Sequence, residues 1–179
     1  ALVGNGNVAL DVARILTTDP DALAHTDISG HALAALRQSK VAEVVIAARR
    51  RPEHSAFTLP ELIGLTSTCD VVLDADDHDL VQADLAVAED SLTRSKLEIL
   101  SKLGDASVPA TRPRIRLAYQ LTPERILGAD RVSGIEFQVT GTDRTRRLDA
   151  GLVLTSIGYR GKPIRDLPFD DATAVVPND

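Results

Sequence analysis

The amino-acid sequence predicts an α/β fold, in which a parallel sheet with flanking helices is combined with an antiparallel β-meander crossover. Three observations predict it. A glycine-rich turn over residues 4–9 separates a short apolar stretch from a helical pattern. Residues 43–48 are apolar without alternation, which is typical of a strand buried on both faces of a parallel sheet. From Arg114 onwards the hydrophobic pattern has a period of two, as antiparallel strands have.

The glycine-rich turn reads Gly-Asn-Gly-Asn-Val-Ala, which matches the Gly-x-Gly-x-x-Ala fingerprint of a dinucleotide-binding turn. In that pattern Gly4 permits a tight turn, Gly6 lets the backbone approach a pyrophosphate, and Ala9 keeps the following helix close to the sheet. We expect that helix over residues 7–16, with Asn7 as its N-cap, so that its unpaired N–H groups face an anion. The string alone is a weak signal. With the strand and helix patterns around it, it indicates a Rossmann-like sheet.

Length and composition limit the alternatives. The chain has 179 residues, of which 44% are hydrophobic and only 3% aromatic, so we expect one domain with an aliphatic core. The net charge of −6 argues against general nucleic-acid binding, and no apolar run reaches the roughly 20 residues needed to cross a bilayer. Only three residues precede Gly4 and the sequence contains no Met. We therefore predict that residues 1–179 are a single domain excised from a larger protein.

The single cysteine, Cys69, excludes an internal disulfide, a Cys-x-x-Cys pair and a cysteine-held iron–sulfur cluster within this segment. A reducing compartment, and so a cytoplasmic location, fits this usage best. The histidines are scattered, without triad partners, so no catalytic residue and no metal site are predicted.

The end of the predicted strand 43–48 carries the sequence Arg49-Arg50-Arg51-Pro52. An enzyme that prefers NAD usually has an acidic residue here, which accepts hydrogen bonds from the ribose 2′-hydroxyl. Guanidinium groups instead match a phosphate, so the expected cofactor is NADP(H). The alternative is a solvated basic cluster. Arg49 lies 45 residues after Gly4, more than the usual interval of about 20, and a helical insert over residues 19–40 accounts for the excess.

The next segments predict a helix, a strand and a second helix. Thr58 and Glu61 have capping-box spacing. Glu61 therefore either completes a helix cap or contacts the nicotinamide-side ribose. Residues 69–74 are expected as a short strand, and residues 79–103 as one long helix that ends at Gly104. Its carboxylates, including those of Asp84, Glu89 and Asp90, are expected on a solvated face.

The period-two region predicts the antiparallel meander, with strands at residues 114–121, 124–127 and 132–139 and an edge at 146–148. Turns are expected at residues 122–123, 128–130 and 140–143. A buried run over residues 152–157 then returns to the parallel sheet and ends in glycine, at the edge where ligands bind in such folds.

Taken together, residues 4–14, the Arg49-Arg50 pair, residues 56–58 with Glu61, and residues 156–161 resemble the NADP domain of the adrenodoxin-reductase-like ferredoxin–NADP reductases. The resemblance implies a larger protein whose single FAD domain is split, with one part on either side of this segment. In it, hydride passes from NADPH to FAD and electrons leave to a ferredoxin.

The same resemblance implies the roles of the site residues. Arg49 and Arg50 hold the 2′-phosphate. Asn5, Gly6, Asn7 and Val8 line the pyrophosphate. Glu61 and the turn that contains Gly158 and Gly161 lie towards the nicotinamide. The segment itself would bind NADP(H) weakly, would not bind FAD and would transfer no hydride alone.

Two positions depart from the family pattern. Gly64 stands where the family has a second acidic residue, so the proton-handling role of that residue is not transferred. Arg51 stands where glycine is common, and it either adds charge at the 2′-phosphate or is solvated. Two other functions stay open: a non-catalytic NADP-sensing module, and the nucleotide domain of another flavoprotein of the thioredoxin-reductase or glutamate-synthase kind.

Overall fold

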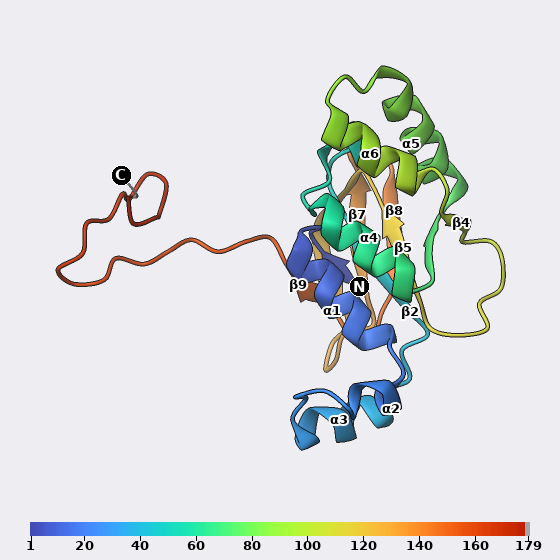
Figure 1. The fold of residues 1–179 in the computed structure, drawn as a ribbon, viewed down its shortest axis with the longest axis horizontal. Coiled ribbons are helices and arrows are strands. Elements are labelled where there is room, and N and C mark those ends of the chain that lie inside the picture. Colours follow the sequence, from blue (N-terminus) through green and yellow to red (C-terminus); the bar gives the residue numbers. More distant parts are fainter. Residues whose placement is uncertain (178–179) are drawn as a thin grey trace.

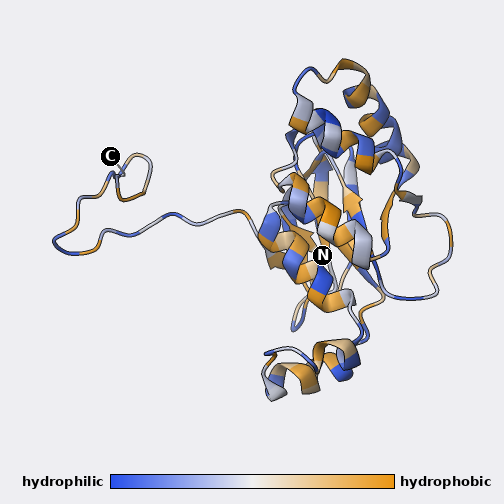
Figure 2. Ribbon diagram, in the orientation of Figure 1, coloured by the Kyte–Doolittle hydropathy of each residue, from blue (hydrophilic) through white to orange (hydrophobic). Residues whose placement is uncertain are grey.

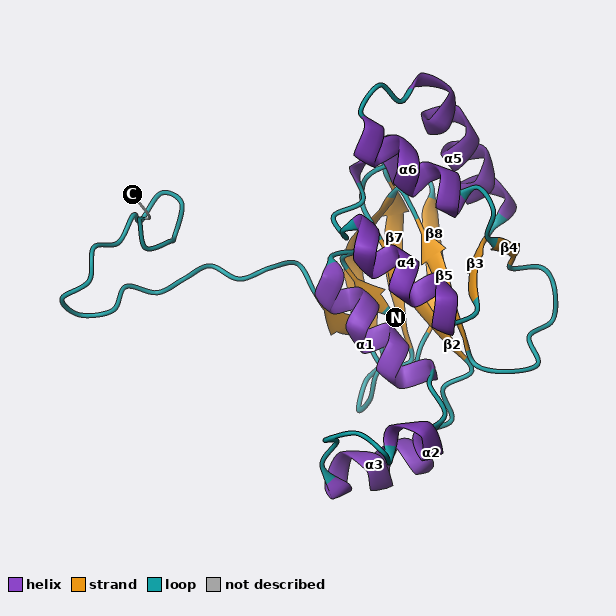
Figure 3. Cartoon of the chain, in the orientation of Figure 1, coloured by secondary structure: helices purple, strands orange, loops and turns teal. Residues whose placement is uncertain are grey.

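A six-stranded parallel sheet forms the centre of the fold (Figure 3). The computed structural model describes residues 1–177. All strand pairs in this sheet are parallel, which confirms the predicted α/β class. Across the sheet, the strands run in the order β4 (Gly104–Asp105), β3 (Val71–Leu73), β5 (Arg114–Ala118), β2 (Glu43–Ala47), β1 (Leu2–Val3) and β9 (Leu154–Thr155).

Helices cover one face of the sheet. Helices α1 (Asn7–Thr17) and α4 (Leu59–Thr68) lie side by side over it, and α5 (Ala75–Val87) packs with α6 (Ser91–Leu100) beside them (Figure 1). Short helices α2 (Pro20–Leu23) and α3 (Gly30–Arg37) form the insert, which protrudes below α1 in Figure 1. Hydrophobic residues, orange in Figure 2, recur along α1, α4 and α3.

The antiparallel meander covers the other face. It consists of β6 (Leu121–Leu127), β7 (Gly134–Val139) and β8 (Thr145–Asp149). Alternate residues of β2 enter two separate cores: Val44 and Ile46 pack under the helices, while Val45 packs against the meander with Phe137. Burial on both faces explains why residues 43–48 are apolar without alternation.

The meander is shorter than the sequence predicts, because residues 114–118 belong to the parallel sheet as β5. Polar and apolar residues alternate in β5 because arginines that form ion pairs occupy the polar positions. These positions do not form a solvated face. Arg114 Nε lies 2.8 Å from Glu43 Oε1, and Arg116 Nη1 lies 2.7 Å from Asp74 Oδ2. The turn predicted at residues 122–123 is also wrong. Those residues lie within β6, where the register shifts just after Pro123.

The helix predicted over residues 79–103 is two helices, α5 and α6. The chain leaves the helical conformation at Ala88, and Asp90 begins α6 by accepting a hydrogen bond from Thr93 N at 2.7 Å. Glu89 and Asp90 are exposed as predicted. The prediction is wrong for Asp84, which is buried with 2% of its surface exposed.

The last predicted strand is shorter than its apolar pattern indicates. Residues 152–157 contribute only β9, and 75% of the surface of Ile157 is exposed. Beyond β9 the chain leaves the sheet as an extended segment (Figure 1). Within residues 1–177, no helix is both long and apolar enough to cross a membrane.

Candidate functional site

The strand register brings four turns to one edge of the sheet. Val3 of β1 is level with Ala47 of β2 and with Thr155 of β9, and Ala47 is level with Ala118 of β5. Since parallel strands end together, the residues that follow them meet at this carboxyl edge. These residues are Gly4, 48–51, 119–120 and Ser156.

Gly4 is required by the protein's own structure. Its φ angle is +104°, and a Cβ atom there would collide with the carbonyl oxygen of Ser156. Its N–H donates to Ala47 O at 2.9 Å, so the turn is fixed between the two neighbouring strands. Gly6 is different, because no atom lies within 4 Å of the position that a Cβ would take. The space above Gly6 is open, as close approach by a ligand requires.

The N-terminus of α1 points into this open space with unpaired donors. In the described part of the chain, the N–H groups of Asn7 and Val8 have no hydrogen-bond acceptor. Ala9 is fully buried, so the helix lies close to the sheet, whereas 58% of the surface of Val8 is exposed. Unpaired donors at the positive end of a helix are suited to hold an anion.

Asn7 is not the N-cap that the sequence predicts. Gly6 occupies that position, and the Asn7 side chain instead accepts a hydrogen bond from Thr58 N at 2.8 Å. This bond joins the N-termini of α1 and α4. The Asn7 side chain therefore satisfies a donor of the neighbouring helix α4, because its Oδ1 accepts the Thr58 N–H, which α4 itself leaves unpaired.

The predicted capping box at Thr58 and Glu61 does not form. Thr58 is the N-cap of α4, but its side chain makes no capping bond, and its N–H already donates to Asn7. The carboxylate of Glu61 is half-buried in the first turn of α4 and has no hydrogen-bond or ion-pair partner among residues 1–177. The capping interpretation is wrong, and a free acceptor remains at this edge of the sheet.

Arg49 and Arg50 have a fixed backbone and free side chains. Arg49 O accepts a hydrogen bond from Thr140 Oγ1 at 2.9 Å, and Arg50 O accepts one from Gln120 N at 3.3 Å. Both guanidinium groups are exposed and have no partner in the part of the chain that the structure describes. Two cationic groups are thus available on the turn that follows β2.

Arg51 differs from its two neighbours, because its guanidinium group forms an ion pair while 36% of its side chain stays exposed. Its Nε donates to Asp84 Oδ1 at 2.7 Å, and Asp84 Oδ2 accepts a second hydrogen bond, from Glu53 N, at 3.0 Å. The sequence did not predict this ion pair, because the partner Asp84 lies far along the chain and is buried.

Asp77 is the second buried carboxylate on α5. Its Oδ1 accepts a hydrogen bond from Tyr119 N at 3.0 Å, while its Oδ2 has no partner among the described residues. Burial raises the pKa of Asp77 to about 7. Asp77 was not identified from the sequence as a buried residue. The signal lay in the spacing: Asp77, Val81 and Asp84 follow the i, i+4, i+7 pattern of a buried helix face.

The structure brings most of the predicted site residues together, with Gly161 as the exception. Gly158 follows Ser156 closely and has a φ angle of +88°. Gly161 donates its N–H to Ala174 O at 3.0 Å, within the segment that leaves the sheet. Between them, Tyr159 is fully exposed.

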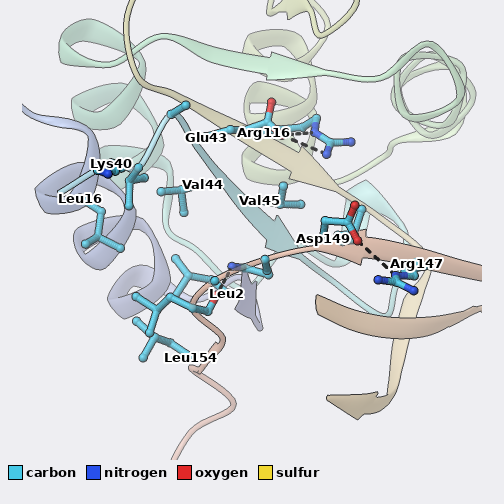
Figure 4. Close-up of a pocket in the computed structure, with 17 residues that line it drawn as sticks. Leu2, Leu16, Lys40, Glu43, Val44, Val45, Arg116, Arg147, Asp149 and Leu154 are labelled. Atoms are coloured by element: carbon cyan, nitrogen blue, oxygen red, sulfur yellow. Dashed lines mark hydrogen bonds and ion pairs between the residues drawn. The ribbon is translucent and has the colours of Figure 1, made fainter. Parts of the chain in front are cut away.

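Two cavities flank the sheet. One, of about 600 Å³, lies at the amino ends of the strands, between Leu2, Leu16, Val44 and Leu154, away from the glycine turn (Figure 4). The other, of about 810 Å³, lies at the carboxyl edge and is lined by Tyr119, Gln120 and Arg146, among others. Gln120 connects this second cavity to the turn that carries Arg50. In residues 1–177 no cluster of His, Cys, Asp or Glu could hold a metal ion.

A parallel α/β sheet with a glycine turn at its carboxyl edge, leading into a helix with unpaired N–H groups, places the chain in the Rossmann-like class. No protein-family model matches the chain. Its similarity to individual proteins is nevertheless close, and it extends over 99% of the chain in each case.

The chain is 69% identical over 181 residues to the "Probable ferredoxin/ferredoxin--NADP reductase" of Mycobacterium tuberculosis, and covers 32% of that protein. It is 39% identical over 192 residues to the "NADPH-ferredoxin reductase FprA" of the same organism, and covers 42% of it. A solved structure of FprA in complex with NADPH matches with a TM-score of 0.84 and 38% identity. The resemblance to ferredoxin–NADP reductases is confirmed, and the chain spans about a third of the first relative's length.

Proposed function

We propose that residues 1–179 form a single NADP(H)-binding domain of a flavoprotein ferredoxin–NADP reductase. One observation carries the proposal. The guanidinium groups of Arg49 and Arg50 have no partners among residues 1–177, and their turn lies at the same sheet edge as the unpaired N–H groups of α1. An extra phosphate beside the pyrophosphate distinguishes NADP from NAD, and this edge offers donors for both groups.

Each remaining site residue has a role that follows from its group. The N–H groups of Asn7 and Val8 would hold the pyrophosphate, which Gly6 leaves room to approach and Asn5 would line. The free carboxylate of Glu61 would accept hydrogen bonds from the nicotinamide-side ribose. Gly158 and Gly161 are assigned to the nicotinamide end on the resemblance of residues 156–161 alone.

The task of this domain is to position the nucleotide. When bound, the nicotinamide supplies the hydride, and the residues named above bind and orient it at some distance from the reacting carbon. We propose no acid–base or nucleophilic group here, and no metal. Hydride transfer would need the FAD domain of the whole protein, which would pass electrons to a ferredoxin. We also propose a cytoplasmic location and neither a nucleic-acid nor a membrane partner.

Titration of NADP⁺ and NAD⁺ tests this function. The wild-type chain is expected to bind NADP⁺ more tightly than NAD⁺. The double variant Arg49→Ala/Arg50→Ala is expected to lose at least about tenfold in NADP⁺ affinity, because a hydrogen bond to a charged group contributes about 1.5–3 kcal/mol. NAD⁺ affinity should change little. Calorimetry or fluorescence measures both constants.

A matched control removes two exposed arginines elsewhere. Arg112 and Arg131 are exposed and lie near the other edge of the sheet, where β5 begins and β6 ends. The variant Arg112→Ala/Arg131→Ala changes the net charge equally and should leave both affinities within about twofold of the wild type. Equal wild-type affinity for the two nucleotides would contradict the proposed function.

A further inference from the structure

Among the three arginines that follow β2, Arg51 alone has a side-chain partner within the described residues. Asp84, its partner, is buried on α5, and the Nε and one terminal nitrogen of the Arg51 guanidinium both face Asp84 Oδ1. The other carboxylate oxygen accepts the Glu53 N–H. Asp84 thus holds both a side chain and the backbone just beyond the Arg49–Arg50 turn.

Further contacts hold the same segment before and after the residues that Asp84 binds. Gln120 N and Thr140 Oγ1 bind the carbonyl oxygens of Arg50 and Arg49. Lys96 Nζ donates to Ser55 O at 3.0 Å. The Asp84 contacts lie between these two sets, so they fix the part of the segment that follows the free guanidinium groups.

The charge of Arg51 is already compensated. A buried carboxylate is stable only with a close cationic or hydrogen-bonding partner, and Arg51 provides the forked donor that fits it. Two of the three guanidinium nitrogens of Arg51 are thus engaged by Asp84, which leaves fewer donors for a ligand phosphate than Arg49 and Arg50 offer. Two long arginine side chains also lose conformational freedom when they bind a phosphate, and a fixed backbone reduces that loss.

We propose that Arg51 and Asp84 are positioning residues that set the preference for NADP over NAD without touching the nucleotide. Their ion pair holds the turn so that Arg49 and Arg50 converge on the 2′-phosphate. This inference rests on the proposed function.

The variant Asp84→Asn separates this role from direct binding by the sign of its effect. If Arg51 bound the phosphate, release from Asp84 would add a free cation to the site, and NADP⁺ affinity would rise or stay the same. If Arg51 positions the turn, the same release loosens the turn, and NADP⁺ affinity falls. Asparagine keeps the shape of the side chain and one acceptor oxygen.

The experiment titrates NADP⁺ and NAD⁺ into the wild type, Asp84→Asn and the control Asp79→Asn, which removes an exposed carboxylate from the same helix. Asp84→Asn is expected to weaken NADP⁺ binding about fivefold to tenfold, with NAD⁺ within about twofold, and Asp79→Asn to change neither. A general loss of fold would weaken both nucleotides together. Unchanged or tighter NADP⁺ binding by Asp84→Asn, in a chain whose wild type still prefers NADP⁺, would overturn this inference and leave the proposed function intact. A wild type without that preference would overturn both.

A measurement on the wild type decides the question even if Asp84→Asn does not fold. The Arg51 Nε–H proton, held by Asp84, is expected to exchange slowly with solvent in the free protein. This slow exchange should persist with saturating NAD⁺ and with saturating NADP⁺. A hydrogen-bond coupling between the Arg51 guanidinium and the phosphorus of the 2′-phosphate would show contact and would refute a positioning role.

Discussion

At the scale of single residues, Gly4 and Gly6 of the turn are glycine for different physical reasons. Gly4 is required by its own fold, through a positive φ angle and the close approach of Ser156. Gly6 has an ordinary φ of −83° and open space where a side chain would lie. The sequence pattern predicted both positions and their different roles, and the structure adds the atom that Gly4 must avoid and the open space at Gly6.

This difference predicts that alanine at position 4 lowers stability, whereas alanine at position 6 lowers NADP⁺ affinity. Gly4→Ala should lower the free energy of unfolding by about 2 kcal/mol or more, through backbone strain and collision. Gly6→Ala should leave it within about 0.5 kcal/mol and weaken NADP⁺ binding instead, because the added methyl group occupies the space above the turn. Urea unfolding and nucleotide titration measure the two effects. Equal loss of stability in both variants would contradict the assignment.

At the scale of elements, local patterns predicted the strand 43–48 and the start of α1 well, because each depends on its own residues. They failed where a distant partner decides the outcome. Polar and apolar residues alternate in β5 because its arginines form ion pairs with Glu43 and Asp74. Among the acidic residues of α5, two carboxylates are buried. Sequence spacing does not show which carboxylates find a donor elsewhere in the chain.

The free energy of unfolding is expected to depend on pH through Asp77 of α5. Its pKa is raised to about 7 in the folded protein by burial, against the opposing hydrogen bond from Tyr119 N and with support from the charge of Asp74. The unfolded chain releases this proton near pH 4. The folded state therefore loses stability from this group as pH rises from about 4 to 7, and the loss is complete above pH 7.

The variant Asp77→Asn removes this ionisation. It should raise the free energy of unfolding by roughly 1–3 kcal/mol at pH 8, with a smaller gain at pH 5, where Asp77 is mostly protonated in the folded protein. Asp79→Asn, exposed on the same helix, serves as the control and should show no such difference between the two pH values. Denaturant unfolding at both values measures this. A gain that is independent of pH would show that Asp77 keeps an ordinary pKa.

At the scale of the whole molecule, the site exists only because the sheet assembles it. Its turns follow β1, β2, β5 and β9, which are separated by long stretches of chain and become neighbours through parallel pairing. The sequence predicted a parallel sheet but not the place of β5 between β2 and β3. Strand order depends on contacts between distant segments, and no local pattern encodes it.

A crystal structure of the chain with NADP⁺ would locate the 2′-phosphate. We expect it between the guanidinium groups of Arg49 and Arg50, with the pyrophosphate on the N–H groups of Asn7 and Val8 and Arg51 still bound to Asp84. A nucleotide bound elsewhere, with Arg49 and Arg50 directed into solvent, would contradict this expectation.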